Sequence, residues 1–214
     1  KETTADMDNV FNHLASQNRL PRMRRLLVAP FHLHRRTLEK IEQVGLAAER
    51  GEGGRIVAKM NSLTDEAIAR ALVLAGQRGA SIDLIVRGAC ILPAQVHGVT
   101  DNIRVRSIIG RFLEHSRVFY FRCGQEEELY CSSADWMNRN MMRRVEIAWP
   151  VTDPELRQRI IDECLVAYEQ DERDAWELQP DGHYVMAGNP VKGLGAQNAL
   201  MERYTPVATT PRGV

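Results

Sequence analysis

The chain of 214 residues carries 28 basic and 28 acidic side chains, so its formal net charge at pH 7 is zero. A balanced charge excludes a global field that attracts nucleic acid, and a polyanion would have to be held by a local basic cluster. No apolar run reaches the length that spans a membrane. The four cysteines lack metal or redox spacing, which predicts scattered buried thiols in a reducing compartment.

Helical patterns alternate with short apolar strands over the first half of the chain. Apolar runs predict strands over 25–30, 55–60 and 81–86. The spacing of apolar residues predicts helices over 5–16, 38–48 and 65–75. Thr64 is the predicted N-cap of the third helix, and Gly51 can end the second because glycine adopts the left-handed position that follows many helices.

The second half begins with a run of strands, predicted near 103–108, 117–122, 128–131 and 144–149. A helix should start at Asp153, with proline next and an acidic residue in its first turn. The sequence over 170–192 predicts irregular structure or a small hairpin. A last short helix is predicted over 194–203, before a flexible end. Strands that alternate with helices, followed by a run of strands, predict an α/β sandwich with a mixed β-sheet flanked by helices.

A histidine and an arginine stand two residues apart at the mouth of the strand predicted over 117–122. Side chains alternate faces along a strand, so His115 and Arg117 should project the same way. A titratable imidazole beside a fixed cation is suited to handling phosphate. The alternative is a solvated histidine without a function.

A second arginine follows the apolar strand over 81–86. Arg87 is followed by Gly88, which lets the backbone come close to a ligand. Ligands of open α/β sheets gather outside the carboxyl ends of strands. Arg87 is therefore a candidate for ligand binding, with an ordinary surface charge as the alternative.

Four segments together resemble a known family. They are Asp83–Cys90, Thr100–Arg104, Arg111–Val118 and Ser132–Asn140. In order and in spacing they resemble the carboxy-terminal catalytic domain of bacterial polyphosphate kinases of the first type, and Asn61 and Glu146 also fit. The resemblance implies a phospholipase D-like sandwich. His115-Ser-Arg117 would be a degenerate copy of the His-x-Lys motif of the phospholipase D superfamily.

The resemblance also implies roles for individual residues. Arg87 would bind nucleotide phosphates, and His115 would contact the terminal phosphates and support their transfer. Arg117 would neutralise charge, and Asp135 would lie at the phosphate site near His115, unless it caps a helix. Glu146 would orient the imidazole, unless it pairs with a neighbouring arginine. The histidine that becomes phosphorylated would lie in a preceding domain.

The expected activity is reversible transfer of the terminal phosphate of ATP to polyphosphate. The implied partners are ATP or ADP, polyphosphate, Mg²⁺ that accompanies ATP, the preceding domain and further copies in a homo-oligomer, with no nucleic acid. No metal ligands can be named in this chain. We expect a carboxy-terminal piece that is inactive alone, from a protein of the cytoplasm or the periphery of the inner membrane.

The expected organisation is the end of a preceding domain or a linker helix over 1–20, the catalytic domain over 21–170, and an extension over 171–214. Two other functions stay open. One is a phospholipase D-like phosphodiesterase, against which Arg117 and Arg122 argue because that chemistry needs the intact motif. The other is a non-catalytic module for polyphosphate binding or dimerisation.

Overall fold

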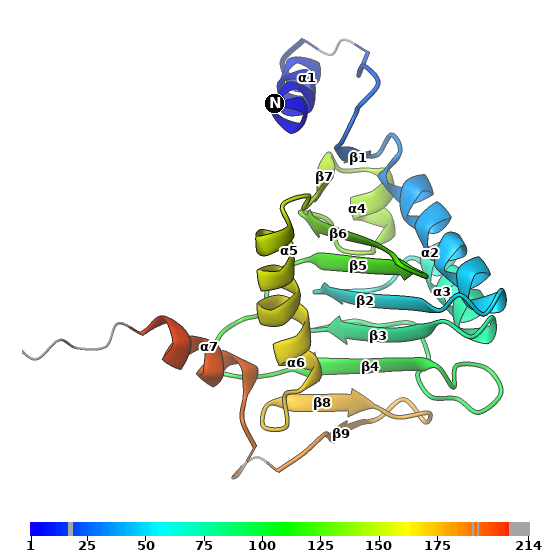
Figure 1. The fold of residues 1–214 in the computed structure, drawn as a ribbon, viewed down its shortest axis with the longest axis vertical. Coiled ribbons are helices and arrows are strands. Elements are labelled where there is room, and N and C mark those ends of the chain that lie inside the picture. Colours follow the sequence, from blue (N-terminus) through cyan, green and yellow to red (C-terminus); the bar gives the residue numbers. More distant parts are fainter. Residues whose placement is uncertain (17–18, 190, 192, 206–214) are drawn as a thin grey trace, which may run out of the picture.

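The computed structural model describes residues 1–16, 19–189, 191 and 193–205 (Figure 1). Its strands are β1 (Leu27–Ala29), β2 (Gly54–Met60), β3 (Ser81–Val86), β4 (Ile103–Ile108), β5 (Val118–Cys123), β6 (Glu126–Ser132), β7 (Glu146–Pro150), β8 (Ala175–Leu178) and β9 (Tyr184–Met186). Its helices are α1 (Glu2–Ser16), α2 (Leu33–Glu49), α3 (Glu66–Gln77), α4 (Asn138–Met142), α5 (Pro154–Ile160), the π-helical segment η1 (Ile161–Val166), α6 (Ala167–Glu169) and α7 (Ala196–Tyr204).

The described strands form one sheet in the order β1-β7-β6-β5-β2-β3-β4-β8-β9. β2 pairs in parallel with β3, and β3 with β4, whereas the other neighbours are antiparallel. The parallel strands are joined by the crossover helix α3 and by the loop before β4. The predicted α/β sandwich with a mixed sheet is confirmed.

Helices cover both faces of the sheet (Figure 1). Side chains alternate along β2, so Ile56 and Ala58 enter the main core with α2 and α3, while Val57 faces the opposite side. There Val57 belongs to a smaller cluster with Leu165 of η1. The central strands are thus buried on both faces, which explains why their sequences read as continuous apolar runs.

Helix ends follow the predicted chemistry with one correction. The N-cap of α3 is Asp65, not Thr64, because the Asp65 carboxylate accepts the N–H of Ile68 at 3.0 Å. Asp153 caps α5 as predicted, accepting the N–H of Leu156 at 2.9 Å. Gly51 follows α2 with φ +74°, the left-handed conformation expected of it.

The later part of the chain contains two features that local patterns left undecided. Residues 175–186 form the hairpin β8–β9, which extends the sheet beside β4. The short helix α4 was not predicted, because five residues give no apolar period. The division at residue 170 stays a prediction, and the flexible end predicted after the last helix falls on 206–214, outside the described residues.

The cysteines depart from one expectation. All four are free and half-buried, rather than fully buried. Burial nevertheless raises the pKa of each thiol, to about 11 for Cys131. Across the described ranges, no helix combines the length and the apolar character needed to cross a membrane.

Helix α1 is tied to the sheet edge by one carboxylate. Asp6 accepts the backbone N–H groups of Arg24, Arg25 and Leu26 at 2.9, 2.6 and 3.0 Å. Burial raises the pKa of the Asp6 carboxyl, but these hydrogen bonds outweigh it, so the pKa lies below its usual value. This contact holds the backbone of 24–26 in place.

The core position of α3 can be tested within one helix. Leu72 is 0% exposed and Leu74 is 55% exposed. Leu72→Ala should lower the free energy of unfolding by about 2–5 kcal/mol, because it leaves a cavity. Leu74→Ala should change it by less than about 0.5 kcal/mol. Urea denaturation checks both, and equal effects would contradict this packing.

Candidate functional site

One pocket collects side chains from distant parts of the sequence. Its volume is about 530 Å³, and its lining residues are Asn61, Ser62, Arg87, His115, Arg117, Ser133, Asp135, Met137, Arg139, Asn140, Arg144 and Glu146. All five residues singled out in the sequence lie here. Trp136, next to Asp135 in the sequence, belongs to the core, whereas Met137 lines the pocket.

Strand directions explain why these residues meet. Asn61 follows β2 and Arg87 follows β3, so both stand at the carboxyl ends of parallel strands. β5 runs antiparallel to β2, so its first residues lie at the same edge, where Lys59 is opposite Val118. The pocket therefore occupies the sheet edge at which α/β proteins bind ligands.

A nearly buried ion pair forms the floor of the pocket. Arg117 donates through Nε and Nη2 to the two carboxylate oxygens of Asp135, at 3.2 and 3.1 Å. Asp135 is 6% exposed and also accepts the backbone N–H of Asn61 at 2.7 Å. Asp135 does not cap a helix, since the N-cap of α4 is Met137. It joins the start of β5 to the end of β2.

The same arginine fixes the imidazole of His115. Nη1 of Arg117 lies 3.2 Å from Nδ1 of His115 and donates to the His115 carbonyl at 3.0 Å. Arginine has no acceptor, so Nδ1 must accept and carries no proton. In the neutral ring the proton then resides on Nε2, which is the nitrogen free to donate a hydrogen bond to a ligand.

Arg87 brings an uncompensated cation to the pocket. Its Nη1 is buried and has no hydrogen-bond partner among the described residues, and no ion pair is formed by its guanidinium there. Its backbone is held by the bond from its N–H to the Met60 carbonyl at 3.2 Å. Buried polar atoms are rarely left without partners, so Nη1 marks a place for an acceptor that is not part of the described chain.

Glu146 lies in the pocket with partners of its own. Asn140 Nδ2 donates to one of its oxygens at 2.7 Å, and the Ser133 hydroxyl donates to the other. The alternative considered for Glu146, an ion pair with Arg143 or Arg144, is not formed among the described residues. The orientation of His115 is set by Arg117, and the role of Glu146 toward the imidazole stays a prediction.

A buried network anchors the loop that carries His115. Glu114 accepts from Lys59 Nζ at 2.6 Å, Tyr168 Oη at 3.0 Å and Gln197 Nε2 at 2.6 Å. Gln197 also bonds both backbone groups of Phe112, at 2.8 Å each. Burial lowers the pKa of Lys59 although Glu114 opposes the shift. The network was not foreseen from sequence, since its members are up to 138 positions apart, from Lys59 to Gln197.

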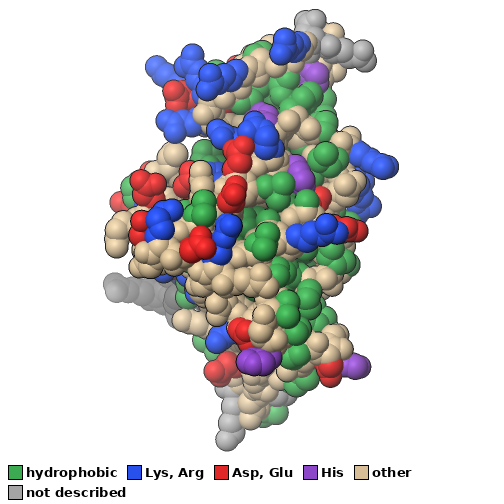
Figure 2. Space-filling model, turned by 90° about the vertical axis from the view of Figure 1, so that its right-hand side faces the viewer, with side chains coloured by type: hydrophobic (Ala, Val, Ile, Leu, Met, Phe, Trp, Pro, Cys, Tyr) green, Lys and Arg blue, Asp and Glu red, His purple; other side chains and the backbone are tan. Residues whose placement is uncertain are grey.

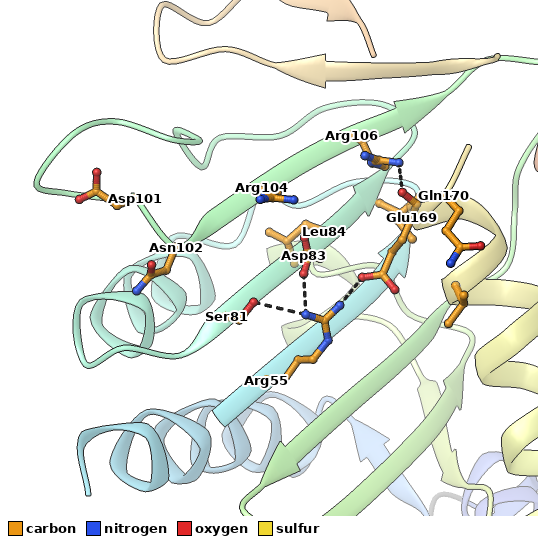
Figure 3. A pocket seen from close by; sticks show the side chains of 12 residues that line it. Arg55, Ser81, Asp83, Leu84, Asp101, Asn102, Arg104, Arg106, Glu169 and Gln170 are labelled. Carbon is orange, nitrogen blue, oxygen red and sulfur yellow. Dashed lines mark hydrogen bonds and ion pairs between the residues drawn. The ribbon is translucent and has the colours of Figure 1, made fainter. Parts of the chain in front are cut away.

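A second pocket lies at the opposite ends of the parallel strands (Figure 3). Here Arg55 contacts Ser81, Asp83 and Glu169, and Arg106 bonds the Glu169 carbonyl. Burial raises the pKa of the Glu169 carboxyl. These charges compensate one another and hold α6 against the sheet, so the pocket has a structural explanation that the His115 pocket lacks.

The sequence predicted no role for several polar residues of the site, although Asn61 fits the family that the sequence resembles. Arg139 and Arg144 line the pocket, and Asn61 and Asn140 each present a buried Oδ1 without a partner among the described residues. The three arginines within 139–144 were the available signal for Arg139 and Arg144. No group of three or more His, Cys, Asp or Glu that could hold a metal ion occurs in the described part of the chain.

The pocket is lined by four arginines and one histidine, and its two carboxylates are both engaged by neighbours. The chain is thus an α/β domain with a basic pocket at one edge of its sheet. The family model described as polyphosphate kinase C-terminal domain 2 matches residues 26–197. The chain belongs to the polyphosphate kinase family.

Individual relatives agree with this assignment. A polyphosphate kinase of Synechocystis sp. is 52% identical over 180 residues, which cover 84% of this chain and 25% of that protein. One from Xylella fastidiosa is 46% identical over 199 residues, covering 92% of this chain and 28% of that protein. The crystal structure of polyphosphate kinase from Porphyromonas gingivalis matches with a TM-score of 0.87 and 36% identity, over 92% of this chain and 30% of that one. The chain thus spans about a quarter of the length of the curated relatives it matches.

The anchoring network makes a prediction about the loop. Gln197→Ala removes the bonds to Phe112 and one bond to Glu114. The loss should lower the free energy of unfolding by roughly 1–3 kcal/mol, because the part-buried backbone groups of Phe112 lose their partner and Glu114 loses one of its donors. Hydrogen exchange of the Phe112 amide should accelerate, while exposed Glu202→Ala on the same helix should leave it unchanged. An unchanged exchange rate in Gln197→Ala would show that other contacts hold the loop.

Proposed function

We propose that this chain is the part of a polyphosphate kinase that binds the phosphates of ATP and assists reversible transfer of the terminal phosphate to polyphosphate. The observation that carries the proposal is that one pocket contains both Arg87 and His115. The buried Nη1 of Arg87 has no partner among the described residues, and the Nε2 of His115 is free to donate. Family membership supports the substrates, ATP and polyphosphate.

The geometry suggests a division of labour among the site residues. Arg87 is free to contact phosphate oxygens, whereas the donors of Arg117 are engaged by Asp135 and His115. Arg117 and Asp135 thus act by holding His115 and the strand ends in place, rather than by direct phosphate contact. Glu146 fixes the wall formed by Ser133 and Asn140.

In the transfer step a nucleophile attacks the terminal phosphorus, and the bond from phosphorus to the bridging oxygen of ATP breaks. Negative charge develops on that oxygen as ADP leaves. His115 Nε2–H can donate a hydrogen bond to it, and Arg87 can stabilise the equatorial phosphate oxygens. Such chemistry depends on positioning and charge neutralisation. We place the phosphohistidine in another part of the full-length protein, in line with the expectation from sequence.

Magnesium is expected to arrive bound to the phosphates of ATP, since Mg²⁺ is commonly held by one or two carboxylates together with substrate phosphates. The described residues provide no cluster of ligands for it. No step assigned here to His115 or Arg87 requires a metal ligand from this chain.

The role of His115 can be measured in the full-length enzyme. His115→Ala should lower kcat by roughly 10²–10⁴-fold, the range for a general acid or base, with a smaller effect on nucleotide binding. His97→Ala is the control, since His97 is fully exposed and lies outside the pocket. Acid-labile labelling with ATP labelled at its terminal phosphate should find the phosphohistidine at another position. Recovery of the label on His115 would reverse the assigned roles.

Substitutions of Arg87 distinguish a phosphate-binding residue from an ordinary surface charge. Arg87→Ala should reduce kcat/KM for ATP by about ten- to a hundred-fold, because hydrogen bonds to charged groups contribute roughly 1.5–3 kcal/mol. Arg87→Lys should retain only part of the kcat/KM that Arg87→Ala loses, because an ammonium group cannot form bidentate hydrogen bonds to phosphate. Arg104→Ala, in the second pocket, should leave the kinetics unchanged. Unaltered kinetics of Arg87→Ala would rule out the phosphate contact.

If neither variant affects turnover while polyphosphate still binds, the chain is a binding module rather than part of the catalytic machinery. Steady-state kinetics and direct binding of polyphosphate to the same variants distinguish the two functions.

A further inference from the structure

Charge is distributed unevenly along this neutral chain. Residues 9–38 contain no Asp or Glu, yet they contain six arginines: Arg19, Arg22, Arg24, Arg25, Arg35 and Arg36. We call these six side chains the arginine track. None of them lines the pocket that contains His115. The track is thus the local basic cluster that a chain of zero net charge needs in order to hold a polyanion at a second place.

The arginine track has few compensating carboxylates. Arg25 pairs with Glu2 at 2.7 Å, and Arg35 and Arg36 share Glu39 at 2.5 and 2.9 Å. Arg19, Arg22 and Arg24 form no ion pair with any described residue. The six cations therefore have two carboxylates as ion-pair partners, and both carboxylates are partly exposed. Exposed ion pairs contribute only about 0–1 kcal/mol, so a phosphate group can replace these carboxylates at little cost.

A third carboxylate lies close by but faces the backbone. Asp6 accepts the N–H groups of residues 24–26, so its oxygens are occupied while it fixes the segment that carries Arg24 and Arg25. Side chains on a fixed backbone lose less freedom on binding a ligand.

The track follows a row of connected surface hollows. One hollow is lined by Glu2, Arg22, Met23, Arg24, Arg25 and Arg36. It shares Arg22 and Arg36 with a neighbour that contains Arg19 and Arg35. On its other side it shares Arg24, Arg25 and Arg36 with a hollow of mixed charge. This third hollow contains Arg157 and Lys40, but also Glu127 and Glu128, and Glu128 pairs with Lys40. Basic side chains gather at the upper end of the molecule in Figure 2, the end at which α1 lies in Figure 1.

The shape and chemistry of the row favour a bare phosphate polymer. A compact anion would occupy one hollow, whereas a linear polyanion can contact all three. A nucleic acid strand would also need aromatic faces for its bases. The two aromatic residues of the hollows, Phe31 and Tyr130, each already have a neighbour at the ring. The centroid of the His13 ring lies 5.1 Å from that of Phe31, and Lys40 Nζ lies 5.0 Å from the centroid of Tyr130. Guanidinium groups, in contrast, are well matched to phosphate oxygens.

We propose that the arginine track is an auxiliary binding site for the polyphosphate chain, separate from the pocket in which phosphate is transferred. The proposal rests on the proposed function, which identifies the polymer. The track would retain a long chain between turnovers, and chains too short to reach it would gain nothing.

The test uses the full-length protein with the triple variant Arg22→Gln, Arg24→Gln and Arg36→Gln. The control is Arg70→Gln, Arg104→Gln and Arg203→Gln, which removes the same charge from exposed positions outside the track. Binding of long-chain polyphosphate should weaken about tenfold or more in the track variant. The slope of log affinity against log salt should fall by about 2, for three lost contacts at roughly 0.7 each. KM for ATP and the affinity for tripolyphosphate should not change in either variant.

Each other outcome counts against the proposal. Unchanged long-chain affinity, or an equal loss for tripolyphosphate and the long chain, would overturn it, provided that the melting temperature matches the parent protein. The track variant could instead lose binding to single-stranded DNA or to anionic vesicles while it retains binding to polyphosphate. That result would assign the arginine track to the partner whose binding is lost. Polyphosphate binding is measured without turnover, so turnover of His115→Ala tests the proposed function separately. Full activity of His115→Ala would contradict the proposed function and leave the binding result for the arginine track unaffected.

Discussion

The contact between Arg117 and Asp135 determines the geometry of the whole site. One guanidinium, bonded to both carboxylate oxygens, also bonds the ring and carbonyl of His115. The carboxylate reaches across to the backbone of Asn61 at the end of β2. A buried ion pair is weak evidence for stability, since desolvation opposes its attraction. Its consequence here is specific: it selects one tautomer of the imidazole and fixes the distance between two strand ends.

The two pockets of the sheet differ in how their charges are balanced. In the pocket of Figure 3, Arg55 is held by Asp83 and Glu169 and needs no further partner. In the His115 pocket, the carboxylates of Asp135 and Glu146 are engaged by neighbours while Arg87 keeps a buried donor free. An anion bound in the His115 pocket would give the free donor of Arg87 a partner. An anion bound in the pocket of Figure 3 would disturb ion pairs that are already complete. This contrast is the reason for proposing the phosphate site at the carboxyl ends of the strands, in the pocket of His115.

The fold was largely predictable because its signals are local. Continuous apolar runs marked β2 and β3, and Asp153 with the following proline marked the start of α5. The errors lie where local signals compete or vanish. Thr64 and Asp65 are both good capping residues, and only the path of the chain decides that Asp65 accepts the N–H of Ile68. Helix α4 has too few residues to show a period.

The residue types suited to phosphate chemistry could be read from the chain: Arg87 after an apolar strand, and His115 two positions before Arg117. The alternation of strands and helices could be read as well, because burial of apolar side chains follows periodicity along the chain. The contacts of each polar group, in contrast, depend on how the chain folds. In the structure Arg117 bonds to Asp135, and Glu146 accepts hydrogen bonds from Ser133 and Asn140. Lys59 and Gln197 both donate to Glu114 beneath the loop. Hydrogen bonds depend on distances of about 3 Å between groups that the sheet brings together, and no local pattern in a sequence records them.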